Sequence, residues 1–308
     1  MRVSSASLFR KAYGKYGIGA FNVFTAEQVH AVFKGALLSS APVIVAITPA
    51  ARRYMQPCML DAMIRGAEEL YPDVIHSVHL DHGNEPHCTD SIDSGDYTSV
   101  MIDASLEPFE ENIKISGRVS AHAHVKGVDV EAELGMLGGK EDDITGNDRA
   151  GYTDPEQAVE FIDRTGCNAL AVAVGTSHGA YKGSGKGLRL DILAEIQKKL
   201  PSFPLVLHGA SNVPLDEVRR INKAGGTLKE SAKGIADEQL KEAIKLGVCK
   251  INVATDARLI WTRVHREFFR DSPDLFDPVI PGAKYMEELA EFVASRCRLF
   301  GAEGQNKG

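Results

Sequence analysis

The sequence predicts a single α/β domain folded as a (β/α)8 barrel. Short apolar segments of strand type alternate with amphipathic segments of helix type, and eight such pairs follow one another along the 308 residues. The strand-like segments are apolar along their whole length, as expected when both faces of a parallel sheet are buried. A doubly wound sheet is the alternative, but it usually has fewer strands and a Gly-x-Gly-x-x-Gly turn after the first strand. No such turn follows Val23, so eight units favour the barrel.

Each unit joins one apolar segment to the segment of helical periodicity that follows it. The first four units are predicted at 18–23 with 26–38, 42–47 with 59–70, 75–81 with 85–94, and 99–102 with 109–125. The last four are predicted at 129–134 with 155–165, 169–174 with 190–200, 205–208 with 215–224 and 236–246, and 249–253 with 257–271. A final amphipathic helix is expected at 286–300, which completes one domain at 1–300, and residues 301–308 are expected to form a disordered tail.

Composition and charge exclude several classes of protein. The net charge of -7 argues against a nucleic-acid partner, which would require a basic surface. The five cysteines are widely spaced and form no Cys-x-x-Cys pair, which is typical of free thiols in a reducing compartment. The N-terminus lacks the apolar stretch of a signal peptide, and no segment reaches the roughly 18 to 20 apolar residues of a membrane span. We therefore expect a cytoplasmic protein without a membrane partner.

Three histidines, His82, His178 and His208, each end or follow a strand-like segment and are each followed by glycine. The carboxyl ends of all strands of a barrel meet at one face, so these side chains are expected to converge there, with Glu133 and Asn252 at the ends of two further strands. Three imidazoles with an open fourth position are typical of catalytic zinc. His79 is the nearest rival ligand, although strand alternation places it one position out of phase with His82.

Other polar residues at the same strand ends allow two interpretations each. Asp81 can transfer a proton to or from a metal-bound substrate, or it can hold a histidine ring in place. Gly179, Gly209 and Ser211 with Lys182 can form a phosphate site, or the glycines can serve only the turns. The glycine- and acid-rich segment 135–143 can close over the site, but taken by itself it is more typical of a solvated acidic turn.

Together, seven short segments resemble the class II, zinc-dependent ketose-bisphosphate aldolases, and above all the fructose-1,6-bisphosphate aldolases. The segments are GAFNV at 19–23, HLDHG at 79–83, SVMID at 99–103, VEAELG at 130–135, GTSHGAYK at 175–182, LHGAS at 207–211 and KINV at 250–253. The resemblance extends over nearly the whole chain, and the number and order of the segments make it specific. It implies reversible cleavage of fructose 1,6-bisphosphate into dihydroxyacetone phosphate and glyceraldehyde 3-phosphate, through an enediolate whose charge one Zn²⁺ per subunit stabilises.

The resemblance also implies roles for individual residues. The zinc ligands would be His82, His178 and His208, with Glu133 as an alternate ligand or a partner of a ligand. Asp81 would move the proton on the C4 hydroxyl and Glu141 the proton at C3 of dihydroxyacetone phosphate, which reverses the interpretation of 135–143 as a plain turn. The residues that would contact substrate are Gly179, Lys182, Gly209, Ser211 and Thr255 at the first phosphate, with a monovalent cation such as Na⁺ or K⁺ nearby, Asn22, Thr48 and Asn252 along the sugar, and Arg258 at the distal phosphate. A homodimer or homotetramer is implied, with the C-terminal helices as a plausible interface.

Three alternatives stay open. Ala254 stands where fructose-specific members usually carry an acidic residue, and Thr48 stands where serine is common, so a tagatose 1,6-bisphosphate aldolase is the first alternative. Arg258 and the segment 221–226 favour the fructose form. A zinc hydrolase on the same barrel is disfavoured by the phosphate site and by Asn252, which stands where a base would be needed. A non-catalytic barrel is disfavoured because all ligand and acid–base candidates are present.

Overall fold

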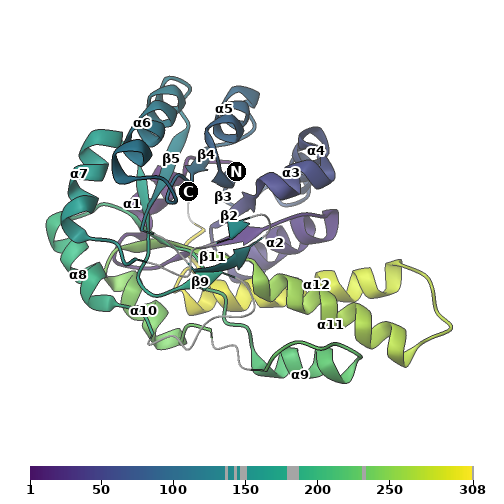
Figure 1. Cartoon of the computed structure of the whole chain (residues 1–308). Coiled ribbons are helices and arrows are strands. Elements are labelled where there is room, and N and C mark those ends of the chain that lie inside the picture. Colours follow the sequence, from purple (N-terminus) through teal and green to yellow (C-terminus); the bar gives the residue numbers. More distant parts are fainter. Residues whose placement is uncertain (136–137, 142–143, 146–150, 179–186, 231–233, 307–308) are drawn as a thin grey trace.

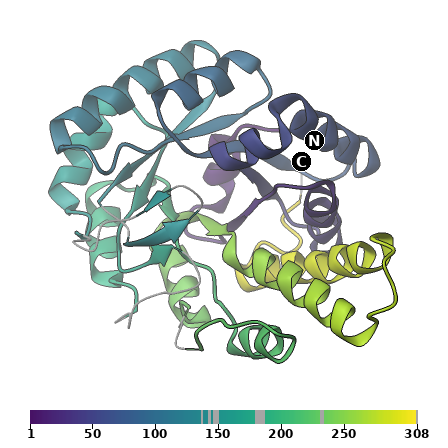
Figure 2. The same ribbon diagram turned by 45° about the vertical axis from the view of Figure 1, so that its right-hand side comes forward.

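Eight parallel strands close into a barrel, with helices around its outside (Figures 1 and 2). This computed structural model describes residues 1–135, 138–141, 144–145, 151–178, 187–230 and 234–306, and at 138–141, 144–145 and 177–178 it describes the backbone. The strands follow the order β1-β11-β10-β8-β5-β4-β3-β2, and β1 pairs with both β11 and β2 to close the ring. The predicted (β/α)8 barrel is therefore confirmed.

The barrel strands lie close to the predicted segments and are buried almost throughout. They are β1 (Ile18–Asn22), β2 (Val43–Ile47), β3 (His76–Gly83), β4 (Ser99–Ile102), β5 (Asp129–Leu134), β8 (Ala169–Val172), β10 (Leu205–Leu207) and β11 (Val248–Val253). Only the first residue of β5 is less than fully buried. Burial on both faces explains why these segments are apolar rather than alternating.

The helices include two that the sequence did not predict, α1 and α3. The full set is α1 (Ser5–Ala12), α2 (Ala26–Ser39), α3 (Pro49–Met55), α4 (Pro57–Leu70), α5 (Glu85–Ser94), α6 (Phe109–Val125), α7 (Pro155–Thr165), α8 (Leu190–Lys199), α9 (Leu215–Lys223), α10 (Asp237–Lys245), α11 (Thr255–Asp271) and α12 (Val279–Leu299). Helix α1 covers the N-terminal end of the barrel, where the Ser5 hydroxyl lies 2.6 Å from Ser77 Oγ and 2.7 Å from Ser99 Oγ. Among the described helices, none is both long and apolar enough to cross a membrane.

The segment after β5 was expected to form a loop, but the structure places two short strands in it. Its backbone forms β6 (Gly138–Glu141) and β7 (Ile144–Thr145), and β6 also pairs in parallel with β9 (Ser177–His178). Gly139 is the pairing partner of His178. The chain that carries Glu141 therefore runs beside the chain that carries His178, a pairing over long sequence distance that no local pattern indicates.

Residues 301–306 pack against the domain instead of forming the expected disordered tail. Ala302 is buried, and the backbone N–H groups of Gly304 and Asn306 donate to the carbonyls of Ser39 and Ser40 at the end of α2. The Asn306 side-chain oxygen accepts a hydrogen bond from Ile75 N at 2.8 Å. These partners lie more than 200 residues away along the chain, so the composition of the tail gave no sign of them.

Gly35 of α2 is required by the close packing of α2 on α12. A Cβ at this position would lie 2.5 Å from the carbonyl oxygen of Ala290 and 2.6 Å from Val293 Cβ. We expect Gly35→Ala to lower the free energy of unfolding by about 1–3 kcal/mol, because overpacking outweighs the better helix propensity of alanine. The measurement is urea denaturation at equilibrium.

Gly66→Ala in α4 is the matched control, because a Cβ at this position would have no neighbour within 4 Å. It should be neutral or stabilising by up to about 1 kcal/mol. Equal stabilisation by both substitutions would contradict the packing argument.

Candidate metal and active site

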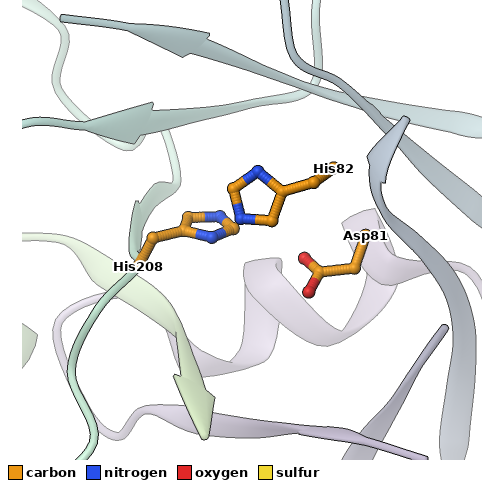
Figure 3. Close-up of side chains that lie close together, drawn as sticks. All are labelled: Asp81, His82 and His208. Carbon is orange, nitrogen blue, oxygen red and sulfur yellow. The ribbon is translucent and has the colours of Figure 1, made fainter. Parts of the chain in front are cut away.

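The site is built around the end of β3, where two consecutive side chains face the same way. Residues that follow each other in a strand normally point to opposite faces. His82, however, has a positive φ of 52°, and the pairing of β3 with β4 shifts register between Leu80 and Gly83. The ligand atoms of Asp81, His82 and His208 consequently lie within 4.8 Å of one another (Figure 3).

His79 is not part of this cluster. Its ring is buried deeper in the barrel, with Nδ1 2.7 Å from Ser99 Oγ and Nε2 3.2 Å from Lys250 Nζ. His79, the alternative ligand suggested by the sequence, therefore makes contacts inside the barrel. Strand alternation alone would place His79 and His82 on opposite faces, but the backbone turn at His82 changes the direction of its side chain.

His208 directly follows β10 and approaches the site from the opposite side of the barrel. Its ring centroid lies 4.5 Å from that of His82 at an interplanar angle of 71° (Figure 3). Gly209, the next residue, has a φ of 61°, a conformation that glycine adopts without strain. Gly209 thus allows the backbone turn that directly follows His208.

Asp81 is a buried carboxylate held by two amides. Its Oδ2 accepts from Asn22 Nδ2 at 2.8 Å, and its Oδ1 accepts from Asn252 Nδ2 at 2.9 Å. Burial by itself raises the pKa of Asp81, but the positive charges of His82 and Lys250 outweigh it and hold the pKa below its usual range. The described hydrogen bonds of Asp81 go to amides rather than to an imidazole, so its geometry suits a proton acceptor.

Asp103, at the end of the segment 99–103, was missed by the sequence reasoning. His82 Nδ1 donates to Asp103 Oδ2 at 2.9 Å, so Nε2 is the ring nitrogen that can face a ligand. Burial lowers the pKa of His82, yet Asp81 and Asp103 raise it to about 10. Asp103 immediately follows β4, and this strand-end position is the signal that could have identified it.

The buried carboxylate of Glu133 shows best whether the residues of the site fit a metal ion. Its side chain is buried, Oε2 lies 3.9 Å from His82 Nδ1, and no described residue gives that oxygen a hydrogen bond. Burial and the neighbouring Asp103 raise the pKa of Glu133 well above its usual value. His82, Asp103 and Glu133 also form a second group with ligand atoms within 4.8 Å of one another. A divalent cation would satisfy these carboxylates, so the donor set fits one.

The loop after His208 is fixed against the start of α11. Ser211 Oγ accepts from Ala254 N at 3.3 Å, and the buried Asp256 carboxylate accepts from Asn212 N at 2.9 Å and Val213 N at 2.7 Å. Thr255 is the first residue of α11. Gly209, Ser211 and Thr255 are thus brought to one end of the barrel, as their expected role at a phosphate requires.

Thr48 and Arg258 lie in two different hollows. Thr48 caps α3, its Oγ1 accepts from Ala51 N at 3.2 Å, and it lines a cavity of about 670 Å³ together with His82 and Asp103. The Arg258 guanidinium lies 4.9 Å from the ring centroid of Phe24, in a second hollow of about 330 Å³ that Tyr54 also lines.

Four of the predicted site residues cannot be placed by their side chains. The backbones of Glu141 and His178 belong to β6 and β9, but their side chains lie outside the described part of the structure. Gly179 and Lys182 lie outside the described residues altogether. The roles expected for these four residues stay predictions.

The chain matches one family model over almost its full length. The model "Fructose-bisphosphate aldolase class-II" matches residues 3–305. The chain belongs to this family. It is therefore a metal-dependent aldolase, a carbon–carbon lyase, and His82 and His208 with the neighbouring carboxylates are the described residues that could hold the metal.

Relatives and solved structures agree with this assignment. The fructose-bisphosphate aldolase of Thermus caldophilus is 43% identical over 312 residues, covering 99% of this chain and 100% of that protein. That of Treponema pallidum is 41% identical over 297 residues, covering 90% of this chain and 89% of the relative. The crystal structure of the YdjI aldolase of Escherichia coli K12 superposes over 100% of both chains with a TM-score of 0.78 and 26% identity.

The contact between Asp103 and His82 leads to a prediction about metal binding. Asp103→Asn should weaken binding of Zn²⁺ by about 10- to 100-fold, because the carboxylate orients the ring and makes its other nitrogen a better donor. The measurement is competition between the metal-free protein and a chelating dye. Asp93→Asn is the control, because Asp93 also contacts a histidine, His122 at 3.0 Å, but on the surface. Wild-type affinity in Asp103→Asn would contradict the assignment.

Proposed function

We propose that the protein catalyses the reversible cleavage of fructose 1,6-bisphosphate to dihydroxyacetone phosphate and glyceraldehyde 3-phosphate, with Zn²⁺ as its metal. The observation that carries the proposal is the buried convergence of Asp81, His82 and His208, with ligand atoms within 4.8 Å. A proton acceptor beside two imidazoles is what a metal-assisted aldol reaction needs. The names of relatives that are 41–43% identical support this sugar as the substrate.

The metal would be held by His82 and His208, with Glu133 as an alternate ligand and His178 as the predicted third histidine, while Asp103 orients the His82 ring. Imidazole and carboxylate donors together suit Zn²⁺. When bound, the ion would supply positive charge that stabilises negative charge developing on the substrate oxygens. The carboxylates of Asp81, Asp103 and Glu133 around His82 support the proposal, because their negative charge would attract a cation.

Asp81 would move the proton on the C4 hydroxyl. In the cleavage direction its carboxylate accepts this proton, and in the condensation direction it returns the proton to the same oxygen. The side-chain oxygens of Asn22 and Asn252 are buried and accept no hydrogen bond from any described group. Substrate hydroxyls could donate to them, which supports the proposed place of both residues along the sugar.

The remaining residues are proposed to bind a phosphate and to exchange the second proton. Gly209, Ser211 and Thr255 at one end of the barrel support a phosphate site, to which Gly179, Lys182 and a monovalent cation such as Na⁺ or K⁺ would contribute. Glu141 would exchange the proton at C3. The pairing of β6 with β9 supports this role, because it brings the backbone near Glu141 beside that of His178.

The choice of sugar epimer concerns the hydroxyl at C4, on which Asp81 would act. Fructose and tagatose 1,6-bisphosphate differ at this one centre, and a few kcal/mol of hydrogen bonding would decide between them. Ala254 donates its backbone N–H to Ser211 Oγ, and its methyl group can make no hydrogen bond to a sugar. The relatives' names favour fructose over tagatose.

Cleavage kinetics test the proposed function directly. We expect cleavage of fructose 1,6-bisphosphate to exceed that of the tagatose epimer, to stop when a chelator removes the metal, and to return with Zn²⁺. Asp81→Asn should lower kcat by about 10²- to 10⁴-fold, since the amide cannot take the proton.

The surface substitution Asp93→Asn should leave kcat unchanged. Full cleavage after the metal has been removed would refute the metal-dependent mechanism. Incorporation of solvent oxygen into the product would indicate the hydrolase instead.

We also propose that the protein acts in the cytoplasm on a small phosphorylated sugar, without a nucleic-acid or membrane partner. The net charge of -7 supports the absence of a nucleic-acid partner. The five free cysteines support a reducing compartment, since four of them are buried as thiols.

The protein is further proposed to form a homodimer or homotetramer through α11 and α12. These two helices reach away from the barrel as a pair (Figure 1). Large apolar side chains between them and at the start of α12 are exposed. Phe276 is 91% and Val279 69% exposed. Apolar surface of this kind is typical of an interface.

Light scattering after size-exclusion chromatography tests this assembly. Phe276→Glu should reduce the molar mass of the particle, because it places a charge in the proposed apolar interface. Val125→Glu is the control, since Val125 is 84% exposed at the end of α6 and outside the pair α11 and α12. A monomeric wild-type protein, or a Phe276→Glu variant of unchanged mass, would contradict the proposal.

A further inference from the structure

A buried lysine beneath the site takes no part in the proposed reaction. Lys250 of β11 is fully buried, and its Nζ lies 2.8 Å from Glu131 Oε2, 3.0 Å from Glu131 Oε1 and 3.2 Å from His79 Nε2. It also lies 3.9 Å from Asp81 Oδ1. A buried ion pair contributes little net stability, because the desolvation of both charges offsets their attraction. The pair is therefore more readily explained by what it holds in place.

Glu131 joins this lysine to a proposed metal ligand. Its Oε1 lies 2.8 Å from His208 Nε2, and the side chains of both residues are almost fully buried. An ionised carboxylate can only accept hydrogen bonds. The hydrogen in this contact must therefore be carried by His208 Nε2.

The other side of the His208 ring gives the same assignment independently. Asn252 Nδ2 lies 2.9 Å from Asp81 Oδ1 and 3.1 Å from His208 Nδ1. Because the Asp81 carboxylate only accepts, the Asn252 atom that faces it is the amide nitrogen. The second hydrogen of that nitrogen is directed at His208 Nδ1, which must then be an acceptor without a proton.

We propose that Glu131, held in place by Lys250, is a positioning residue that keeps His208 in the Nε2–H tautomer and so leaves Nδ1 without a proton, where a metal ion would replace the hydrogen bond from Asn252. This inference rests on the proposed role of His208 as a ligand. Only a ring nitrogen without a proton can bind a metal, and the hydrogen bond of the other nitrogen decides which one that is.

The same contacts explain why two glutamates of β5 have different roles. Glu131 and Glu133 are two residues apart in one strand and so share a face. Glu131 lies deeper in the barrel, and both its oxygens are engaged by Lys250, with His208 as a further partner. Glu133 lies nearer the mouth, where its Oε2 receives no hydrogen bond from the described part of the chain. Glu133 therefore fits a metal ligand, and Glu131 the partner of one.

Glu131→Gln tests the proposal with little change of shape. Glutamine has a single acceptor oxygen, and Lys250, which only donates, will take it. The amide N–H₂ then faces His208 Nε2, so the ring proton is expected to move to Nδ1, and the Asn252 amide has to turn its N–H away from that nitrogen. We expect the Nδ1–H tautomer in the metal-free variant and Zn²⁺ affinity about 10- to 100-fold weaker than in the wild type.

Two further variants separate this effect from general damage to the barrel. Lys250→Met retains the Glu131 carboxylate, so His208 should keep its proton on Nε2. Asp129→Asn makes the same chemical change as Glu131→Gln on the same strand, but Asp129 contacts Ala6 N at 2.7 Å, at the other end of the barrel. It should alter neither the tautomer nor the Zn²⁺ affinity.

The tautomer is read from two-bond ¹H–¹⁵N correlation spectra of the full-length protein labelled at histidine, before and after Zn²⁺ is added. The His208 signals are those lost in His208→Gln. An Nε2–H wild type and an Nδ1–H Glu131→Gln variant are expected. An Nδ1–H wild type, or a Glu131→Gln variant with unchanged tautomer and affinity, would overturn the proposal.

If Glu131→Gln does not fold, the tautomer of the wild type decides, because an Nδ1–H ring would show that Glu131 does not hold the proton on Nε2. No sugar is used in these measurements. The positioning role can therefore fail while aldolase activity is found, and it can hold while that activity is absent.

Discussion

One backbone conformation makes the site possible, the left-handed turn at His82. Without it, Asp81 and His82 would point to opposite faces of β3, and only one of them could reach the barrel mouth. Gly83 completes the turn, because a Cβ there would lie 2.6 Å from Leu80 and 3.2 Å from the carbonyl of Met101. Asp81, the proposed proton acceptor, and His82, a proposed metal ligand, are thus adjacent in space because they are adjacent in the chain.

The second constraint is the balance of charge inside the barrel. Asp81, Glu131 and Glu133 are all buried carboxylates, and among the described side chains Lys250 is the fully buried lysine that faces them. Lys250 compensates the charge of Glu131, and the amides of Asn22 and Asn252 donate hydrogen bonds to Asp81. The carboxylates of Glu133 and Asp103 are left at the mouth beside His82, where a divalent cation would complete the balance. The metal and the interior lysine are in this sense parts of one electrostatic arrangement.

Most of the fold could be predicted because each barrel strand is buried on both faces and each helix has one apolar side. Three of the failures share a cause. Helix α1, the pairing of β6 with β9, and the packed residues 301–306 all depend on partners distant in the chain, such as Ser99 for Ser5 and Ile75 for Asn306. Local periodicity contains no information on such contacts.

The sequence by itself determined the barrel, the family resemblance and the kinds of group at the strand ends, because burial patterns and short motifs are local properties. The tertiary structure decided which of those groups contact one another in the interior and which lie at the mouth of the barrel. The backbone angle at His82 turns its side chain to the face that His79 and Asp81 share, and the position along β3 then places His79 in the interior and His82 at the mouth. Glu131 accepts hydrogen bonds from Lys250, which is 119 residues away in the sequence, whereas Glu133 Oε2 accepts none from any described group and could bind a ligand. These outcomes depend on dihedral angles and cross-barrel distances, which a chain acquires only when the ring of strands closes.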